Sequence, residues 1–186
     1  MLHYSMTSNL IDKRDPAGPR YAWAPIYGQW LTIRPIVPAD AEIETAFLEG
    51  LSAETRYLRF HGGGVRADAA TIKRFTDIDY RSHMALVATV MLDDAELQVG
   101  VARYVVAEDG SAEFAIVVAD QWQGCGLGQR LMSSLIAHAI AAGVPALYGD
   151  VLAANISMLA LMRKLGFTIE AHPDGGELRR ARLPLT

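Results

Sequence analysis

Three glycines at alternate positions stand directly before an amphipathic helix pattern. The segment "GCGLG" covers Gly124 to Gly128, and the apolar residues of "QRLMSSLIAHAI" recur after it at helical spacing. Glycines that merely continued a helix would destabilise it by roughly 2 to 3 kcal/mol relative to alanine. A helix N-terminus presents unpaired backbone N–H groups at the positive end of the helix dipole, and glycine lets a ligand approach them closely. The segment therefore predicts a phosphate or pyrophosphate site.

A single carboxylate interrupts an apolar segment just upstream of these glycines. Glu113 lies in "SAEFAIVV", a strand pattern whose remaining residues are small or apolar. A carboxylate in such a strand is unfavourable unless it is paired or functional. Two roles are open to it: a structural salt bridge, for example with Arg103 on the neighbouring strand, or a general base that removes a proton from a substrate.

The glycines also fit two alternatives to an isolated phosphate site. One is a tight strand-to-helix turn that binds nothing. The second is a dinucleotide site, because Asp150 ends the next strand near the spacing of a ribose-binding acid. The spacing is Gly-x-Gly-x-Gly rather than Gly-x-Gly-x-x-Gly, and too few residues follow Asp150 to complete a doubly wound sheet. Both features count against a dinucleotide fold.

The elements around these residues alternate between strand and helix patterns. Strands are expected at residues 30–37, 84–91, 97–106, 111–118 and 146–152 and around Phe167 and Leu178, and helices at about 39–51, 53–60, 67–76, 127–140 and 155–165. The three middle strands are expected to form an antiparallel meander. The fold class is α+β, with one mixed sheet of about seven strands and helices on both faces. Residues 1–27 are expected to form a tail or arm, and residues 28–186 the single domain.

Composition excludes several classes of protein. The net charge of −4 argues against a nucleic-acid partner that relies on phosphate neutralisation. The single cysteine excludes an intramolecular disulfide, and the five histidines show no zinc-site spacing, so no metal is expected. No secretory signal or membrane-spanning stretch is present in the sequence, which favours a cytoplasmic protein without a membrane partner.

The glycine segment also carries a family resemblance. "QGCGLG" (Gln123 to Gly128) matches the Gln/Arg-x-x-Gly-x-Gly/Ala signature of the GNAT superfamily of acyl-CoA-dependent N-acetyltransferases, and "NISMLALMRKLGF" (Asn155 to Phe167) resembles its second motif. Within that superfamily, "SAETRYLRFH", "IDYRSHMALVA" and "AEFAIVV" resemble the catalytic domain of bacterial Pat-type protein lysine acetyltransferases. Such proteins commonly attach a nucleotide-binding or CoA-ligase-like regulatory portion, which this sequence does not contain, so the resemblance does not carry regulation of that kind over to this chain.

The resemblance implies a GNAT-like splayed mixed sheet and acetyl-CoA as co-substrate, and it assigns residues to the co-substrate. The pantetheine arm would lie between the strand ending at Val118 and the strand ending near Val151, and Glu113 would act as the base. The residues implied to bind the cofactor are Ile116, Val118, Gln123, Gly124, Cys125, Gly126, Leu127, Gly128 and Asn155.

Three residues, Cys125, His61 and His83, are weaker candidates for a chemical role. Cys125 is expected to be incidental and not a nucleophile, and His61 and His83 are expected to be surface or capping residues near the acceptor side. Many superfamily members protonate the departing CoA thiolate with a tyrosine, but the matching position here is Met162. That acid is therefore absent.

By the same resemblance, Asp77 and Asp79 would lie beside the acceptor entrance. They lie in "TDIDYRSH", a polar segment that could be an ordinary charged turn or could steer a cationic amine toward Glu113. The expected function is transfer of an acetyl group from acetyl-CoA to a primary amine, preferably a protein lysine. The alternatives are acetylation of a small-molecule amine, and a non-catalytic acyl-CoA sensor with the same fold.

Overall fold

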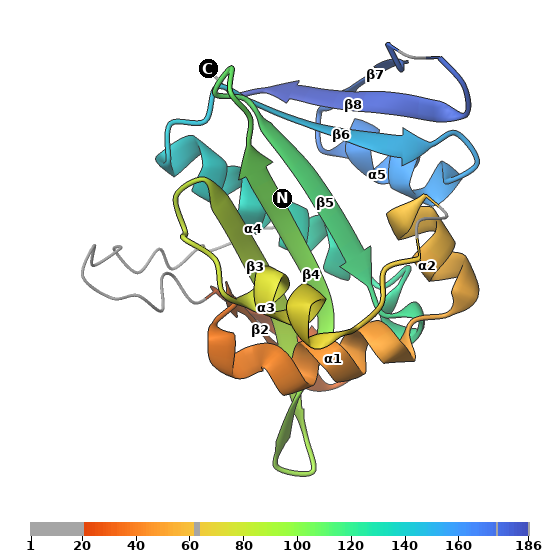
Figure 1. The fold of residues 1–186 in the computed structure, drawn as a ribbon. Coiled ribbons are helices and arrows are strands. Elements are labelled where there is room, and N and C mark those ends of the chain that lie inside the picture. Colours follow the sequence, from red (N-terminus) through yellow and green to blue (C-terminus); the bar gives the residue numbers. More distant parts are fainter. Residues whose placement is uncertain (1–20, 62–63, 174, 186) are drawn as a thin grey trace.

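One mixed β-sheet with helices on both faces forms the part of the chain that the structure describes (Figure 1). The structure is a computed structural model that describes residues 21–61, 64–173 and 175–185. Within these residues the sheet has eight strands in the order β1-β2-β3-β4-β5-β6-β8-β7. The strands are β1 (Tyr21–Ile26), β2 (Gln29–Pro35), β3 (His83–Leu92), β4 (Ala95–Val106), β5 (Ala112–Val118), β6 (Ala146–Leu152), β7 (Thr168–Ala171) and β8 (Leu178–Pro184).

The expected meander of three middle strands is confirmed. β3 pairs antiparallel with β4, and β4 pairs antiparallel with β5. Asp93 and Asp94 connect β3 to β4 with φ values of 48° and 64°, a left-handed pair typical of two-residue hairpin turns. This turn therefore places β3 and β4 side by side in opposite directions.

The N-terminal boundary differs from the expected one. Residues 21–26, expected in an arm, form β1, which pairs antiparallel with β2 through a turn at Tyr27 and Gly28. Pro25 obscures this strand in the sequence, and a proline is tolerated at the edge of a sheet, where β1 lies. β1 raises the number of strands from about seven to eight. The rest of the expected arm, residues 1–20, lies outside the described residues.

The helices form two layers, as expected. α4 (Leu127–Ala141) and α5 (Ile156–Lys164) cover one face, whereas α1 (Ala41–Gly50), α2 (Ala53–Phe60) and α3 (Ala69–Thr76) lie on the other (Figure 1). A short 3-10 helix, Pro38–Asp40, leads into α1, and a second one, Asp120–Trp122, precedes the glycine segment. None of the described helices is both long enough and apolar enough to cross a membrane.

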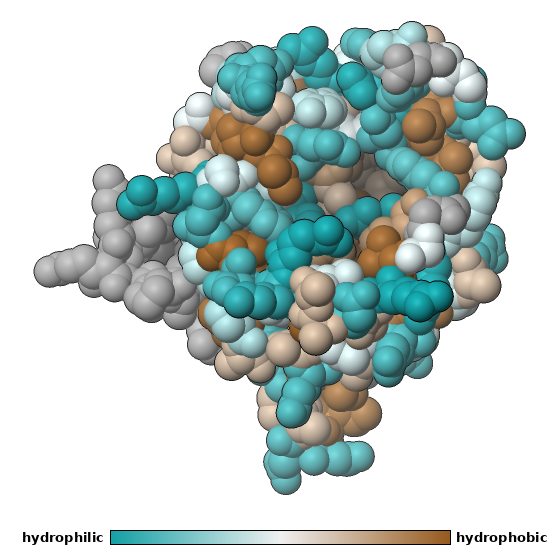
Figure 2. Space-filling view, in the orientation of Figure 1, coloured by the Kyte–Doolittle hydropathy of each residue, from teal (hydrophilic) through white to brown (hydrophobic). Residues whose placement is uncertain are grey.

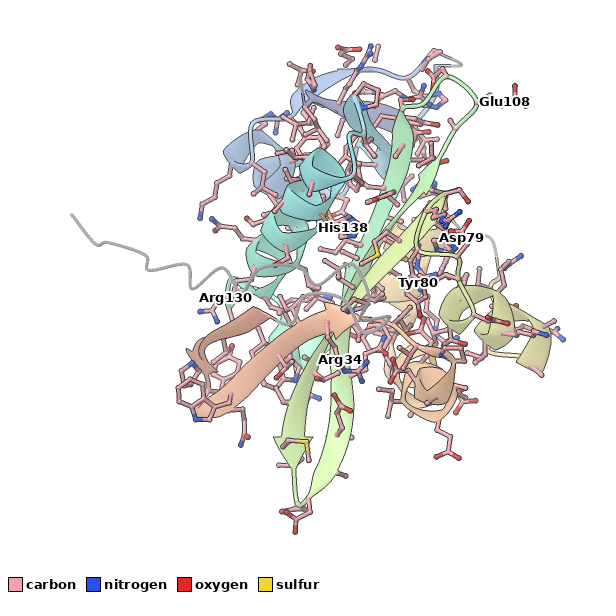
Figure 3. The ribbon with its side chains drawn as sticks, turned by 90° about the vertical axis from the view of Figure 1, so that its left-hand side faces the viewer. Arg34, Asp79, Tyr80, Glu108, Arg130 and His138 are labelled. Atoms are coloured by element: carbon pink, nitrogen blue, oxygen red, sulfur yellow. The ribbon has the colours of Figure 1, made fainter. Side chains whose placement is uncertain are left out.

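Alternation along the strands divides the core into two clusters. In β4, Ala102 and Tyr104 belong to the cluster under α4, while Val101 belongs to the cluster under α1 and α3. The hydroxyl of the fully buried Tyr104 lies 3.0 Å from Nδ1 of His138. His138 belongs to α4 and its side chain points toward the sheet (Figure 3), so this polar contact connects α4 to β4.

The sheet splays between β5 and β6. These strands run parallel, but their register contains only Ala112 with Leu147 and Glu113 with Tyr148. Beyond these pairs the C-terminal ends of β5 and β6 separate, as Figure 1 shows. Ligands in sheets with parallel strands commonly bind outside the carboxyl ends of those strands. The splay therefore creates a place where a ligand can enter the sheet.

Candidate active site

A cleft of about 420 Å³ lies where β5 and β6 separate. Its walls come from both strands, from α2, from the N-terminal end of α4 and from α5. The space-filling view shows a hollow in this region with hydrophilic residues around much of it (Figure 2). The expected site residues that line it are Glu113, Ile116, Val118, Gln123, Gly124, Gly126, Gly128 and Asn155. The volume suits an extended small-molecule ligand.

The glycine segment presents its backbone to this cleft. Gly124 and Gly126 have φ values of 71° and 89°, and Gly126 is the N-cap of α4. A Cβ added at either position would meet no atom within 4 Å, so these glycines leave open space beside the backbone. The first N–H groups of α4 have no partner within the helix itself. The segment therefore fits a phosphate group.

Two residues of the same segment turn their side chains elsewhere. Leu127 is fully buried in the core. Cys125 donates its thiol hydrogen to the carbonyl oxygen of Trp122 at 2.8 Å. Neither residue lines the cleft, so any contact that they make with a ligand would come from the backbone.

Gln123 fixes the segment to the rest of the cleft. Its Nε2 donates to the Val118 carbonyl and to the Thr55 hydroxyl, both at 3.1 Å. The Thr55 hydroxyl donates in turn to Asp120, which also accepts hydrogen bonds from the backbone and side chain of Ser52. The start of α2, the end of β5 and the glycine segment are therefore held together.

Asn155 begins α5 at the opposite wall. Its side-chain oxygen accepts hydrogen bonds from the Met158 backbone and from the Ser157 hydroxyl, each at 3.1 Å. This is an N-cap, and it orients the side chain because the oxygen is fixed by the helix. The amide nitrogen is the group that could donate to a ligand in the cleft.

Glu113 lies on β5 at the point where the strands begin to separate. Its side chain is exposed toward the cleft, not buried as the apolar pattern of the strand implied. Among the described residues, no cationic group lies within salt-bridge distance of its carboxylate. The carboxylate is thus positioned to accept a proton from a group in the cleft.

A salt bridge between Glu113 and Arg103, the structural alternative, is not formed. The Arg103 guanidinium instead lies 3.4 Å from the fully buried carboxylate of Glu44 on α1 and stacks over the ring of Phe75. In the register, Arg103 lies opposite Ala115 and not opposite Glu113. Burial raises the pKa of Glu44, while Arg103 and a hydrogen bond from Gln98 oppose that increase. Arg103 therefore belongs to a buried network that connects the sheet to α1.

The two histidines differ in their relation to the cleft. His61 lines it and ends α2 with a φ of 51°. His83 lies outside it, with Nε2 3.4 Å from Arg103. Burial, and then the charge of Arg103, lower the pKa of His83 to about 4. His83 is therefore neutral at neutral pH.

Asp77 and Asp79 are not brought to the cleft. Asp77 lies beside a second pocket between α1 and α3. Asp79 accepts hydrogen bonds from the Ser82 hydroxyl and from the backbone of Arg81 and His83, and these bonds lower its pKa strongly. Its carboxylate stabilises the turn before β3, where Figure 3 shows it. An ordinary charged turn accounts for Asp79 better than a steering role does.

Asp150 and Met162 are both held by contacts within the protein. Asp150 lines the cleft, and its carboxylate is bound to Arg180 at 2.9 Å and 3.0 Å and to His172 at 3.1 Å. The carboxylate is therefore part of an ion pair and is not free to bind a ribose. The mainly antiparallel sheet also rules out the doubly wound dinucleotide fold. Met162 is fully buried in the core and does not line the cleft.

Thr55 and Arg59 line the cleft from α2, although the sequence does not single them out. They lie four residues apart, so they share one face of the helix. The segment "AETRYLRF" predicts a helix, but nothing in it shows which face turns toward β5.

The described residues contain no group of three His, Cys, Asp or Glu side chains that could hold a metal ion.

A splayed mixed sheet, a glycine-rich helix N-terminus and a carboxylate at the splay define the class of the acyl-CoA-dependent transferases. The family model for the acetyltransferase (GNAT) domain matches residues 31–168. The chain therefore belongs to the GNAT family and is an N-acetyltransferase of that family, whose members use acetyl-CoA.

Similar proteins include two named acetyltransferases. An acetyltransferase of Pseudomonas aeruginosa is 39% identical over 148 residues, which cover 79% of this chain and 80% of the relative. The acetyltransferase Pat of Mycolicibacterium smegmatis is 33% identical over 144 residues, which cover 75% of this chain but only 41% of that longer protein.

Solved structures show the same fold. The GNAT domain of the PAT protein of S. lividans superposes with a TM-score of 0.79 at 26% identity, covering 89% of this chain and 96% of that chain. A putative acetyltransferase of Salmonella typhimurium, solved with acetyl-CoA, has a TM-score of 0.63 at 21% identity and covers 84% of this chain and 94% of its own. The resemblance to Pat-type catalytic domains is confirmed at the level of sequence and fold.

Proposed function

We propose that this chain transfers the acetyl group of acetyl-CoA to a primary amine by direct attack of the amine on the thioester. The observation that carries the proposal is that Glu113 and the glycine segment open into one cleft at the splay of β5 and β6. The glycine segment supplies an anion site at one end, and the carboxylate supplies a proton acceptor toward the other. A protein lysine is the preferred acceptor because the chain resembles Pat-type domains.

The residues divide the binding task between them. Gly124, Gly126 and Gly128 hold the pyrophosphate through backbone N–H groups at the start of α4. Ile116 and Val118 present backbone at the separated edge of β5, where an extended arm can add hydrogen bonds as a strand would. The amide of Asn155 donates to the same arm from the opposite wall.

The base has a defined chemical purpose. A lysine amine has an ordinary pKa near 10.4, so only about one molecule in a thousand is nucleophilic at neutral pH. Glu113 accepts the proton that the amine loses as it attacks. A backbone N–H near Val118 polarises the carbonyl of the thioester. The amine nitrogen bonds to the carbonyl carbon, the C–S bond breaks, and CoA leaves as the thiolate, so that the acetyl group stays on the amine.

The replacement Glu113→Gln tests this function. It keeps the shape of the side chain and removes its basicity, so we expect turnover to fall by about 10²-fold or more while acetyl-CoA affinity stays unchanged. The matched control is Glu108→Gln, because Glu108 lies in the turn between β4 and β5, away from the cleft (Figure 3).

Kinetics across pH 6 to 9 and calorimetry with acetyl-CoA provide the two measurements. A variant with the full rate across this range would show that Glu113 is structural. Acetyl-CoA binding without transfer to any amine by the unaltered protein would instead identify an acyl-CoA sensor.

A further inference from the structure

Arg59 places a positive charge beside the carboxylate proposed as the base. It lies in the last turn of α2 and lines the same cleft as Glu113. The helix is held to the cleft, because Thr55, one turn earlier on the same helix face, is hydrogen-bonded to Gln123 and Asp120. Arg59 therefore belongs to the wall of the cleft.

Arg59 has no carboxylate partner within the described residues. None of the salt bridges among these residues includes Arg59, and the neighbouring cation Arg103 is paired with Glu44. The Arg59 guanidinium lies over the ring of Phe60, 4.8 Å from its centroid. A half-buried cation without a counter-ion is unfavourable unless something else completes the pair.

A second cation beside Arg59 adds to the uncompensated positive charge. Burial, and then the neighbouring charge of Arg103, lower the pKa of Arg59 to about 10, while the charges of Glu113 and Glu44 oppose that decrease. The guanidinium stays protonated at neutral pH. Of the remaining charged groups that line the cleft, Asp150 is taken up by Arg180 and His172, and Lys164 is a second cation.

The missing anion does not belong to the pyrophosphate. Thr55 contacts Gln123, at the edge of the glycine segment, and Arg59 lies one helical turn further along α2, about 6 Å away along the axis. Its charge interacts with that of Glu113 in the same cleft, and the amine acceptor must approach this base. An anion there would come from the acceptor itself.

We propose that Arg59 selects acceptors that carry a carboxylate close to the amine that is acetylated. A guanidinium fork binds a carboxylate through two parallel hydrogen bonds, which gives both affinity and orientation. The carboxylate could come from an aspartate or glutamate beside an acceptor lysine, or from a small amino acid. This inference rests on the proposed function, and it defines the acceptor more narrowly than a cationic amine alone.

Matched pairs of acceptors test the selection. One pair consists of blocked lysine peptides in which glutamate or glutamine follows the lysine, and the other of γ-aminobutyrate and its amide. We expect the unaltered protein to have a KM about tenfold lower for the carboxylate member of at least one pair, as a charge-assisted hydrogen-bonded pair would give. Which pair shows the difference identifies the source of the carboxylate.

Three variants of the full chain complete the experiment. Arg59→Gln should abolish the preference, because the KM for the carboxylate acceptor should rise about tenfold, to that of its neutral partner. Arg59→Lys should keep part of the preference, because it retains the charge without the fork. Arg66→Gln removes the same charge from a position outside the cleft and should leave the preference intact. Thermal unfolding of each variant checks that it is folded.

The outcomes separate the role of Arg59 from the proposed function. Equal KM values for both members of each pair with the unaltered protein, or a preference that survives Arg59→Gln, would overturn the role of Arg59 alone. A loss of kcat in Arg59→Gln that is equal for charged and neutral acceptors, with the KM ratio of each pair unchanged, would also overturn it, because the cation would then act on the reaction and not on the carboxylate. If the unaltered protein acetylates no amine, both proposals fail.

Discussion

Gly149 on β6 lies directly against Phe114 on β5. A Cβ added to Gly149 would lie 2.8 Å from the Phe114 ring and 2.9 Å from the Phe114 carbonyl oxygen. The Phe114 ring is in turn packed edge-on against Phe167, with centroids 5.1 Å apart. These contacts occur one residue beyond the last register pair of the two strands, where the cleft begins. The absence of a side chain at Gly149 therefore sets how closely the strands approach before they separate.

The replacement Gly149→Ala is expected to destabilise the protein by about 1 to 3 kcal/mol, because the ring and the backbone of Phe114 must both move. Urea unfolding measures the effect. The control is Gly50→Ala in α1, where a Cβ meets nothing within 4 Å and alanine should stabilise the helix slightly. Equal stabilities for the two variants would mean that β6 shifts freely against Phe114.

The replacement Gly126→Val should weaken acetyl-CoA binding by about tenfold or more, because a side chain would fill the space beside the backbone N–H groups. Calorimetry measures the affinity. A valine there also strains the left-handed backbone, so the control is Gly110→Val: Gly110 has a φ of 82° against 89° for Gly126, has equally open surroundings, and lies outside the cleft. If both variants bind acetyl-CoA as the unaltered protein does, the segment is not part of the site.

The replacement Met162→Tyr should lower stability by about 2 kcal/mol or more and should not raise the acetyl-transfer rate. Met162 is fully buried, so a tyrosine there overpacks the core and places its hydroxyl among apolar residues. Ile140→Tyr is the control, because Ile140 is 54% exposed on α4. Urea unfolding and steady-state kinetics give the readouts. A rate increase above about tenfold would show that protonation of the departing thiolate limits turnover.

Acidification should destabilise the protein partly through His83. Its pKa falls from an ordinary 6.5 to about 4 on folding, because the site is buried and faces Arg103. The unfolded chain therefore binds a proton that the folded protein does not, and the stability from neutral His83 is lost as pH falls from 6.5 toward 4.

The variant His83→Gln should show a smaller decrease in unfolding free energy between pH 7 and pH 5 than the unaltered protein, measured with urea. Some decrease should remain, because burial also lowers the pKa of His138. Carboxyl groups with a lowered pKa, such as Asp79, titrate below this window. Identical pH profiles would show that His83 is readily protonated in the folded state.

The sequence by itself determined the features that depend on neighbouring residues. Alternation and turn residues such as Asp93 and Asp94 predicted the meander of β3, β4 and β5, because hairpin turns need few residues and a left-handed backbone. The spacing of Gly124, Gly126 and Gly128 before an amphipathic helix predicted a backbone-lined anion site, and the structure leaves that backbone open to the cleft.

Only the tertiary structure decided which side chains meet across the sheet. Arg103 was a reasonable partner for Glu113 by strand order, but the register and the packing of α1 give it to Glu44 and leave Glu113 exposed in the cleft. Arg59 lines the same cleft because α2 packs beside β5, where Gln123 is hydrogen-bonded to Thr55 and to Val118. Such contacts join residues far apart in the chain, so the local signals of the sequence carry no information about them.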